Sequence, residues 1–144
     1  MAKLTKKQIE EIKDSADYFY EYSKDVFEYQ KDGKYTLVQN GKILIASADW
    51  VMWYAKNVYK YRKDGKYILI QDGKILIDNV DDVWRYAKDV FTYRKNDKWT
   101  LIQNGEILID NVDGVWWYAK DVFSYDKDGK EYEINLNKEV KNNE

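Results

Sequence analysis

The stretch Lys31–Ile45, KDGKYTLVQNGKILI, returns twice more along the chain with few changes. The copies are KDGKYILIQDGKILI at Lys63–Ile77 and KNDKWTLIQNGEILI at Lys95–Ile109. Comparing the sequence with itself gives a period of 32 residues, and a fixed period of this size is the signature of a repeat architecture. After an N-terminal segment, 1–14, we expect a domain of four units, 15–144, with the units at 15–46, 47–78, 79–110 and 111–144.

Pairs of turn-forming residues separate the β-rich runs inside each unit. Asp32-Gly33 and Asn40-Gly41 can supply the positive φ angles that two-residue hairpin turns require. The third unit has Asn96-Asp97 in place of the first pair, and these residue types also tolerate the left-handed region. This pattern predicts three antiparallel strands in each unit.

The first part of each unit fits two different structures. In the third unit, Val83, Ala87 and Val90 recur at a helical spacing. The equivalent stretches 49–59 and 113–123 are rich in Trp, Tyr and Val, which favours a strand. We therefore expect a fourth strand, and the alternative is an α+β repeat of one helix and three strands.

The predicted fold class is all-β, with four tandem antiparallel β-meanders that form either a small propeller-like ring or an open array. The run KILI at 42–45 does not alternate apolar with polar residues, which suggests a strand that is buried on both faces. Thr5 and Gln8 have the spacing of a capping box, so we expect a short helical cap in the N-terminal segment. The polar tail at 130–144 is typical of a terminal repeat that stays soluble.

The repeated sequence also resembles a known family, the bacterial WG (KWG) repeat. KDGKYTLVQNGKILI and KNDKWTLIQNGEILI, with DNVDDVW at 78–84, are similar to its Lys-Asp-Gly-Lys-Trp core and the Gly-Lys and aliphatic strand that follow. The likeness covers most of residues 24–136. The Gly that normally follows the Trp is replaced by Thr36, Ile68 and Thr100. The resemblance implies a β-repeat scaffold for interaction, and it carries no catalytic residues over to this chain.

Composition argues against several classes of function. The chain has 24 basic and 26 acidic residues, a net charge of −2, which does not suit binding to nucleic acid. It has no His and no Cys, so the usual zinc sites and the Ser-His-Asp and Cys-His catalytic groups cannot form. We expect no metal, no cofactor and no enzymatic activity. We see no signal peptide and no transmembrane segment, so we expect a cytoplasmic protein with no membrane partner.

Seven columns of the repeat are identical in all four units, and among them are the Tyr22 column, the Asp17 column and three columns of lysines. The tyrosines could line a groove that stacks bases or sugars, but we expect them in the core. The aspartates could ring a channel and bind a hard cation, but we expect turn residues whose carboxylates accept backbone hydrogen bonds. The lysines beside the turns are expected to be solvated. The columns are Tyr22, Tyr54, Tyr86 and Tyr118, Asp17, Asp49, Asp81 and Asp113, and Lys24, Lys31 and Lys34 with their equivalents.

The most informative positions are those at which similar repeats differ. The seventh position of the units reads Glu21, Trp53, Arg85, Trp117, and the fourth reads Tyr18, Trp50, Asp82, Gly114. A position that accepts Glu, Arg and Trp does not fit a core, so Trp53 and Trp117 should be partly exposed. Exposed Trp and Arg are enriched at binding hot spots, and the alternative is neutral drift after duplication. The candidate binding residues are Trp53, Arg85, Trp117, Trp50, Glu21 and Tyr18.

These features predict a non-enzymatic repeat scaffold that binds a protein partner through an aromatic-rich face. One alternative is a lectin-like module in which Trp53, Trp117 and the repeated tyrosines stack on sugars. A second is a small phage-encoded inhibitor that binds a host defence protein, and a third is a designed scaffold without a natural ligand.

Overall fold

The computed structural model describes residues 3–136, which form one helix and fifteen β-strands in four antiparallel sheets. The all-β prediction with a short N-terminal helix is confirmed. The first segment of each unit is a strand, so the alternative of one helix and three strands per repeat is wrong. Residues 1–2 and 137–144 lie outside the described range, including most of the polar tail. Within residues 3–136, no helix has the length and apolar character needed to span a bilayer.

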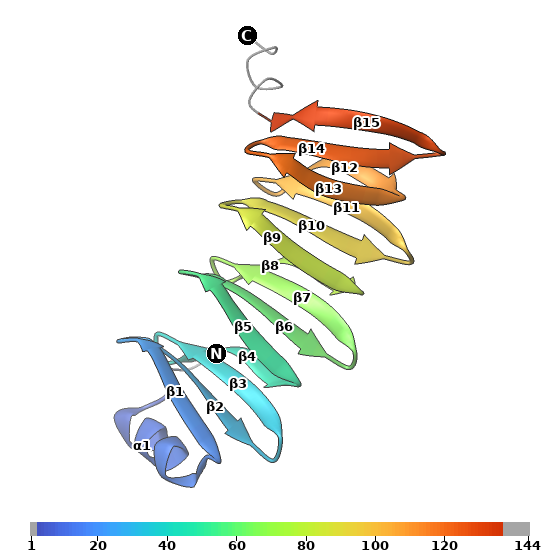
Figure 1. The fold of residues 1–144 in the computed structure, drawn as a ribbon. Helices are drawn as coiled ribbons and strands as arrows, with labels where there is room; N and C mark the ends of the chain where they lie inside the picture. Colours follow the sequence, from blue (N-terminus) through green and yellow to red (C-terminus); the bar gives the residue numbers. More distant parts are fainter. Residues whose placement is uncertain (1–2, 137–144) are drawn as a thin grey trace. The chain divides into compact units, whose positions relative to one another are not determined.

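The chain divides after Asp78 into two compact units. The first contains helix α1 (Lys6–Ser15) and a sheet in which each strand pairs with its neighbour in the chain (Figure 1). This sheet consists of β1 (Tyr18–Ser23), β2 (Val26–Lys31), β3 (Lys34–Gln39) and β4 (Lys42–Ala48). The second sheet has the same order and consists of β5 (Trp50–Ala55), β6 (Val58–Lys63), β7 (Lys66–Gln71) and β8 (Lys74–Val80).

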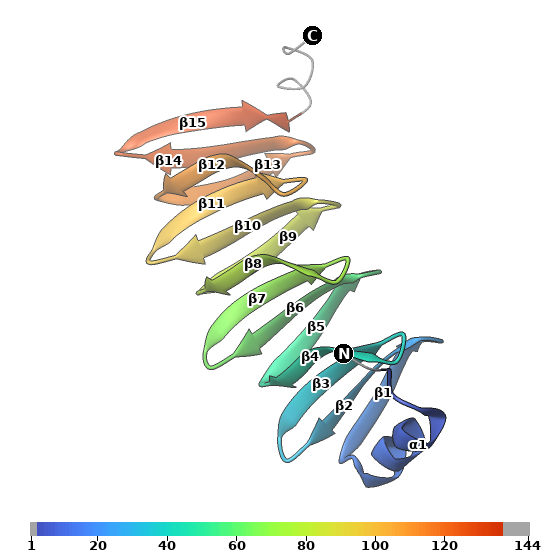
Figure 2. The same cartoon turned by 180° about the vertical axis from the view of Figure 1, so that it is seen from behind.

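The second compact unit repeats this plan (Figure 2). The third sheet consists of β9 (Asp82–Ala87), β10 (Val90–Lys95), β11 (Lys98–Gln103) and β12 (Glu106–Val112). The described part of the fourth consists of β13 (Gly114–Ala119), β14 (Val122–Lys127) and β15 (Lys130–Asn135). Within residues 3–136, the strand order follows the chain in every sheet, and no sheet closes on itself.

Helix α1 begins with the capping box that the sequence predicts. The Gln8 backbone N–H donates to Thr5 Oγ1 at 3.1 Å, and the Thr5 N–H donates to Gln8 Oε1 at 2.8 Å. At the other end of the helix, Lys13 Nζ lies 5.4 Å from the centre of the Phe19 ring and 3.6 Å from the Glu21 carboxylate. These two contacts tie the last turn of α1 to β1.

The predicted turns are confirmed by their backbone angles. Asp32 and Gly33 have φ of 53° and 78°, and two successive positive φ values are typical of the type I′ turn that suits a twisted hairpin. Asn96 and Asp97 adopt φ of 53° and 63° without any glycine. Three repeats also have a positive φ near the end of the fourth strand, which the sequence did not predict. The residues are Ser47, Asn79 and Asn111, with φ of 54°, 57° and 58°. Around Ser47 and Asn111, the pairing of the third strand with the fourth is irregular.

The hydrophobic core of each compact unit lies between its two sheets. In the first unit, Leu37 and Ile45 of one sheet pack in a cluster with Tyr59 and Ile70 of the next. In the second, Leu101 and Ile109 do so with Val115 and Phe123. Each such buried side chain contributes about 1.5–3 kcal/mol relative to an exposed one. A sheet therefore gains its stability mainly by covering its neighbour.

The prediction that the KILI strands are buried on both faces is wrong. Ile75 and Ile107 in the second and third copies are 57% and 56% exposed. They belong to β8 and β12, which are edge strands of their sheets, and they come just after the turn. The beginning of each of these strands is therefore exposed to solvent on one face, while Ile77 and Ile109 further along the same strands are buried.

Candidate binding pockets between adjacent sheets

The aspartate column holds the turn between the second and third strands of its own sheet. In the second sheet, Asp49 Oδ2 accepts a hydrogen bond from the Asp64 N–H at 3.1 Å, and the Asp49 N–H donates to the Arg62 carbonyl at 2.8 Å. The prediction of a turn residue is confirmed. The same carboxylate-to-backbone bond joins Asp17 to Asp32 (3.2 Å), Asp81 to Asn96 (3.0 Å) and Asp113 to Asp128 (3.2 Å).

The same aspartates also join neighbouring sheets. The ammonium of Lys34 on β3 donates to Asp49 Oδ1 at the start of the next repeat, and Lys98 donates to Asp113 in the equivalent way. These hydrogen bonds lower the pKa of Asp49 and raise that of Lys34. Lys34 and Lys98 are therefore inter-sheet partners as well as solvated groups. Among residues 3–136, no acidic cluster has the three members that a metal site needs.

The tyrosine column lies where one sheet meets the next. The Tyr22 ring stands edge-on to the rings of Trp53 and Tyr59, at centroid distances of 5.2 and 6.5 Å. Tyr86 meets Phe123 in the same way at 5.1 Å. The prediction of core tyrosines is correct for the half-buried Tyr22 and wrong for Tyr86 and Tyr118, which are 37% and 74% exposed.

A pocket of about 700 Å³ opens beside Tyr22, between the first and second sheets. Its walls include the rings of Tyr22, Trp53 and Tyr59. Lys56 and Asn57, from the turn between β5 and β6, lie on its polar side. We call it the Trp53 pocket.

The second unit contains a smaller pocket built from the same repeat positions. It has a volume of about 170 Å³ and is lined by Tyr86, Trp117 and Phe123, with Lys120 and Asp121 from the turn between β13 and β14. We call it the Trp117 pocket. Trp53 and Trp117 are 44% and 59% exposed, as expected from the divergence of their column.

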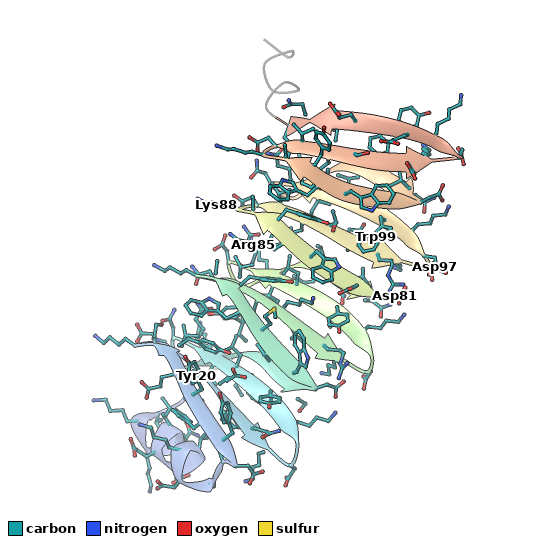
Figure 3. The ribbon with its side chains drawn as sticks, in the orientation of Figure 1. Tyr20, Asp81, Arg85, Lys88, Asp97 and Trp99 are labelled. Atoms are coloured by element: carbon teal, nitrogen blue, oxygen red, sulfur yellow. The ribbon has the colours of Figure 1, made fainter. Side chains whose placement is uncertain are left out.

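The other two members of that column, Glu21 and Arg85, have different surroundings. Glu21 is exposed and pairs with Lys13 of α1. Arg85 is half-buried, and its Nε has no hydrogen-bond partner within the described part of the chain. Figure 3 shows Arg85 and Lys88 near one end of the third sheet and Asp81 and Asp97 near the other.

Tyr18 and Trp50 belong to a different cleft from Trp53. This cleft, of about 470 Å³, also lies between the first and second sheets and is lined by Tyr18, Tyr35, Trp50, Val51, Met52 and Glu28. The Glu28 side chain, on β2, is only 5% exposed. We call this space the Glu28 cleft.

Glu28 belongs to a column that sequence reasoning missed. This column is the third residue of the second strand in each repeat. In all four repeats it follows Val and an aromatic residue and precedes Tyr, while the residue itself changes, as in VFEYQ, VYKYR, VFTYR and VFSYD. A polar residue that varies between fixed apolar neighbours was the available signal. Three of the four members are buried. The column is Glu28, Lys60, Thr92 and Ser124, with the first three 5%, 6% and 0% exposed.

Glu28 and Tyr22 form a buried polar pair beside this cleft. The Tyr22 hydroxyl donates a hydrogen bond to Glu28 Oε1. Burial raises the pKa of the Glu28 carboxyl, while the bond from Tyr22 opposes that rise. Burial together with this bond also raises the pKa of Tyr22. Tyr22 thus lines the Trp53 pocket and also contacts the Glu28 carboxylate.

Comparisons with known proteins do not assign the chain to a family. No protein-family model matches it, and no curated protein is significantly similar to it in sequence. The resemblance to the WG repeat stays a prediction.

Proposed function

We propose that this chain is a non-enzymatic binding module that holds a protein partner through the aromatic pockets between its sheets. The observation that carries the proposal is the duplication of one pocket. Trp53 and Trp117 occupy the same repeat position in the two compact units, and each lies partly exposed against a tyrosine of the preceding sheet. Tryptophan is enriched among binding hot spots, which lie in pockets that lose their water in the complex.

The amount of exposed aromatic surface supports this proposal. Large apolar side chains that stay in water on a folded protein mark interaction surfaces when they are grouped. In the second unit, Trp84, Trp116, Trp117 and Tyr118 are all more than half exposed. Within the first unit, Tyr20 and Met52 add to the exposed side chains near the Glu28 cleft.

A test is affinity capture from cells that contain the natural partner, using the full chain and a variant with Trp53→Ala and Trp117→Ala. We expect a partner that the wild-type chain retains and the folded variant loses. Ile107→Ser is the matched control, because Ile107 is 56% exposed and lines neither Trp pocket. A partner that the double variant still captures at wild-type yield would contradict the proposal.

The pockets also favour a second candidate, binding to carbohydrate. Aromatic walls with an amide or carboxylate at the rim combine a stacking surface with hydrogen-bonding groups, and Asn57 and Asp121 supply those groups here. Two pockets on one chain would strengthen weak binding to a repeating sugar. A glycan array probed at high protein concentration tests this, and binding that is lost in the Trp53→Ala and Trp117→Ala variant would favour sugar over protein.

A further inference from the structure

Lys60 shows how a cation is held at the centre of one repeat. The side chain is 6% exposed, and its ammonium nitrogen lies 4.8 Å from the centre of the Tyr67 ring. The rings of Trp50 and Tyr54 lie 5.8 and 5.9 Å from the same nitrogen. All three distances are within the range over which an aromatic ring attracts a cation through its negative face.

The first repeat has rings at the same three positions but the opposite charge between them. Tyr18, Tyr22 and Tyr35 stand one period before Trp50, Tyr54 and Tyr67. Tyr18 and Tyr35 are arranged edge to face, with their ring centres 6.3 Å apart. The residue one period before Lys60 is Glu28, so a carboxylate replaces the ammonium.

The charge of a buried carboxylate among aromatic rings is poorly compensated. Glu28 accepts one hydrogen bond from Tyr22, and a carboxylate has about four acceptor positions. Removing an ionised carboxylate from water is costly unless a cation or several donors compensate it. The polar side chains around it are those of Tyr18, Tyr22 and Tyr35, and burial raises the pKa of the Glu28 carboxyl. The Glu28 cleft leads to this side chain from the surface and is also lined by Trp50 and Met52.

We propose that the Glu28 cleft binds a basic side chain, arginine or lysine, of the protein partner. The incoming cation would take the place in the first repeat that the Lys60 ammonium takes in the second. Charge complementarity identifies this occupant, because the cleft offers a carboxylate together with Tyr18, Tyr35 and Trp50, and a cation gains from both. The inference rests on the proposed function, since it names one contact of the same protein-binding module.

Capped tripeptides test this inference without knowledge of the partner. Acetyl-Gly-Arg-Gly-amide, acetyl-Gly-Lys-Gly-amide and acetyl-Gly-Gln-Gly-amide differ only in the central side chain, so the first two carry a single positive charge. Each is titrated into the full chain while NMR follows the ring protons of Tyr18, Tyr35 and Trp50. We expect saturable shifts with the Arg and Lys peptides and none with the Gln peptide.

Three variants define the site. Glu28→Gln keeps an acceptor for the Tyr22 hydroxyl and should weaken binding of the basic peptides by about ten-fold or more, since it removes a desolvated charge. Glu28→Lys should abolish the shifts, because residue 28 then supplies its own ammonium. Lys60→Gln is the matched control and should bind the peptides at Tyr18 and Tyr35 as the wild type does. Unfolding curves confirm that each variant is folded.

Two results would overturn the inference. The first is an equal response to the Gln peptide, which would make the cleft a general apolar groove. The second is unchanged affinity of the basic peptides for Glu28→Gln. Neither result bears on the Trp pockets. Conversely, retained partner capture by the Trp53→Ala and Trp117→Ala variant, which would contradict the proposed function, would leave the result of the peptide titration unchanged.

Discussion

Two columns of the repeat differ in chemistry and in surroundings. One is the aspartate near the start of each repeat, and the other is the polar residue in the middle of its second strand. Asp17, Asp49, Asp81 and Asp113 are one residue type making one hydrogen bond four times. Glu28, Lys60, Thr92 and Ser124 are four residue types at equivalent positions, three of them buried. The first column maintains the geometry that every repeat shares. The second varies in charge inside that fixed geometry, so it is the column able to distinguish one repeat from another.

The largest expected change in stability comes from the hydrophobic core. Leu101 is fully buried in the cluster between the third and fourth sheets, so Leu101→Ala should lower the free energy of unfolding by about 3 kcal/mol. The measurement is chemical denaturation followed by tryptophan fluorescence. Ile107→Ala, on an exposed side chain of the neighbouring strand, is the control and should change stability by less than about 0.5 kcal/mol. Equal losses in the two variants would mean that the core lies elsewhere.

Substitution of a residue in the variable column should have a different effect on stability from substitution of the core residue Leu101. Thr92 is fully buried, and its hydroxyl has no hydrogen-bond partner within residues 3–136. Thr92→Val should therefore raise the free energy of unfolding by about 1 kcal/mol, because it removes an uncompensated polar group.

Thr100 offers a matched comparison in the same sheet. It is 4% exposed, and its hydroxyl donates to Asp110 Oδ1 at 2.9 Å. Thr100→Val should lower the free energy of unfolding by about 1 kcal/mol. The same denaturation experiment measures both variants. If Thr92→Val is as destabilising as Thr100→Val, the Thr92 hydroxyl is not an uncompensated polar group.

Glu28→Gln should give a smaller change that depends on pH. Burial raises the pKa of Glu28, so the folded state binds this proton more tightly than the unfolded state. This proton therefore stabilises the folded wild-type protein below the pKa of the unfolded state, about 4.3. The stabilisation is lost as the pH rises through the pKa of Glu28 in the folded state. The side chains that face Glu28 include Tyr18, Tyr22 and Tyr35, and those opposite on β5, Trp50, Val51 and Met52, carry no ionisable group.

The variant should therefore be more stable than the wild type at pH 7, with the difference shrinking toward pH 3. Thermal unfolding at a series of pH values measures it. A variant that is less stable at pH 7 would show that the Tyr22 bond outweighs the cost of burying the charge.

The exposed ion pair should give the smallest effect, with the opposite pH dependence. The bond from Lys98 lowers the pKa of Asp113, so its stabilisation is present above the unfolded pKa of about 3.9. It is lost as the pH falls through the lower folded value. Lys98→Met should slightly lower the melting temperature at pH 7 and leave it unchanged at pH 2. A melting temperature lowered equally at both pH values would point to lost packing instead.

Local signals were enough to predict most of the fold. Asp-Gly and Asn-Gly pairs fix hairpin turns over two residues, so they can be recognised from the sequence without knowledge of the tertiary structure. The positive φ at Asn79 and Asn111 also left a local trace, an Asn before Val, but its meaning depends on strand pairing. The exposure of Ile75 could not be predicted, because it depends on which strand lies at the edge of the sheet.

The candidate site was predicted only in part, for a related reason. Divergence between repeats identified Trp53 and Trp117 as exposed, and Tyr18 and Trp50 as residues worth attention. It did not show that they line two different spaces, because a pocket between sheets combines residues from two repeats. Glu28 was not predicted, because a Glu in an aromatic strand is typical of a surface position and its burial depends on the sheet that covers it.

The order of strands within each sheet has a kinetic consequence. Every strand pairs with the one before or after it in the chain, and the turns that join them are very short. Closing such short loops costs little chain entropy, and a fold made of local pairings has a low contact order. We expect this all-β chain to fold faster than sandwiches of its size. Within each compact unit, folding can begin in either sheet and spread to the other.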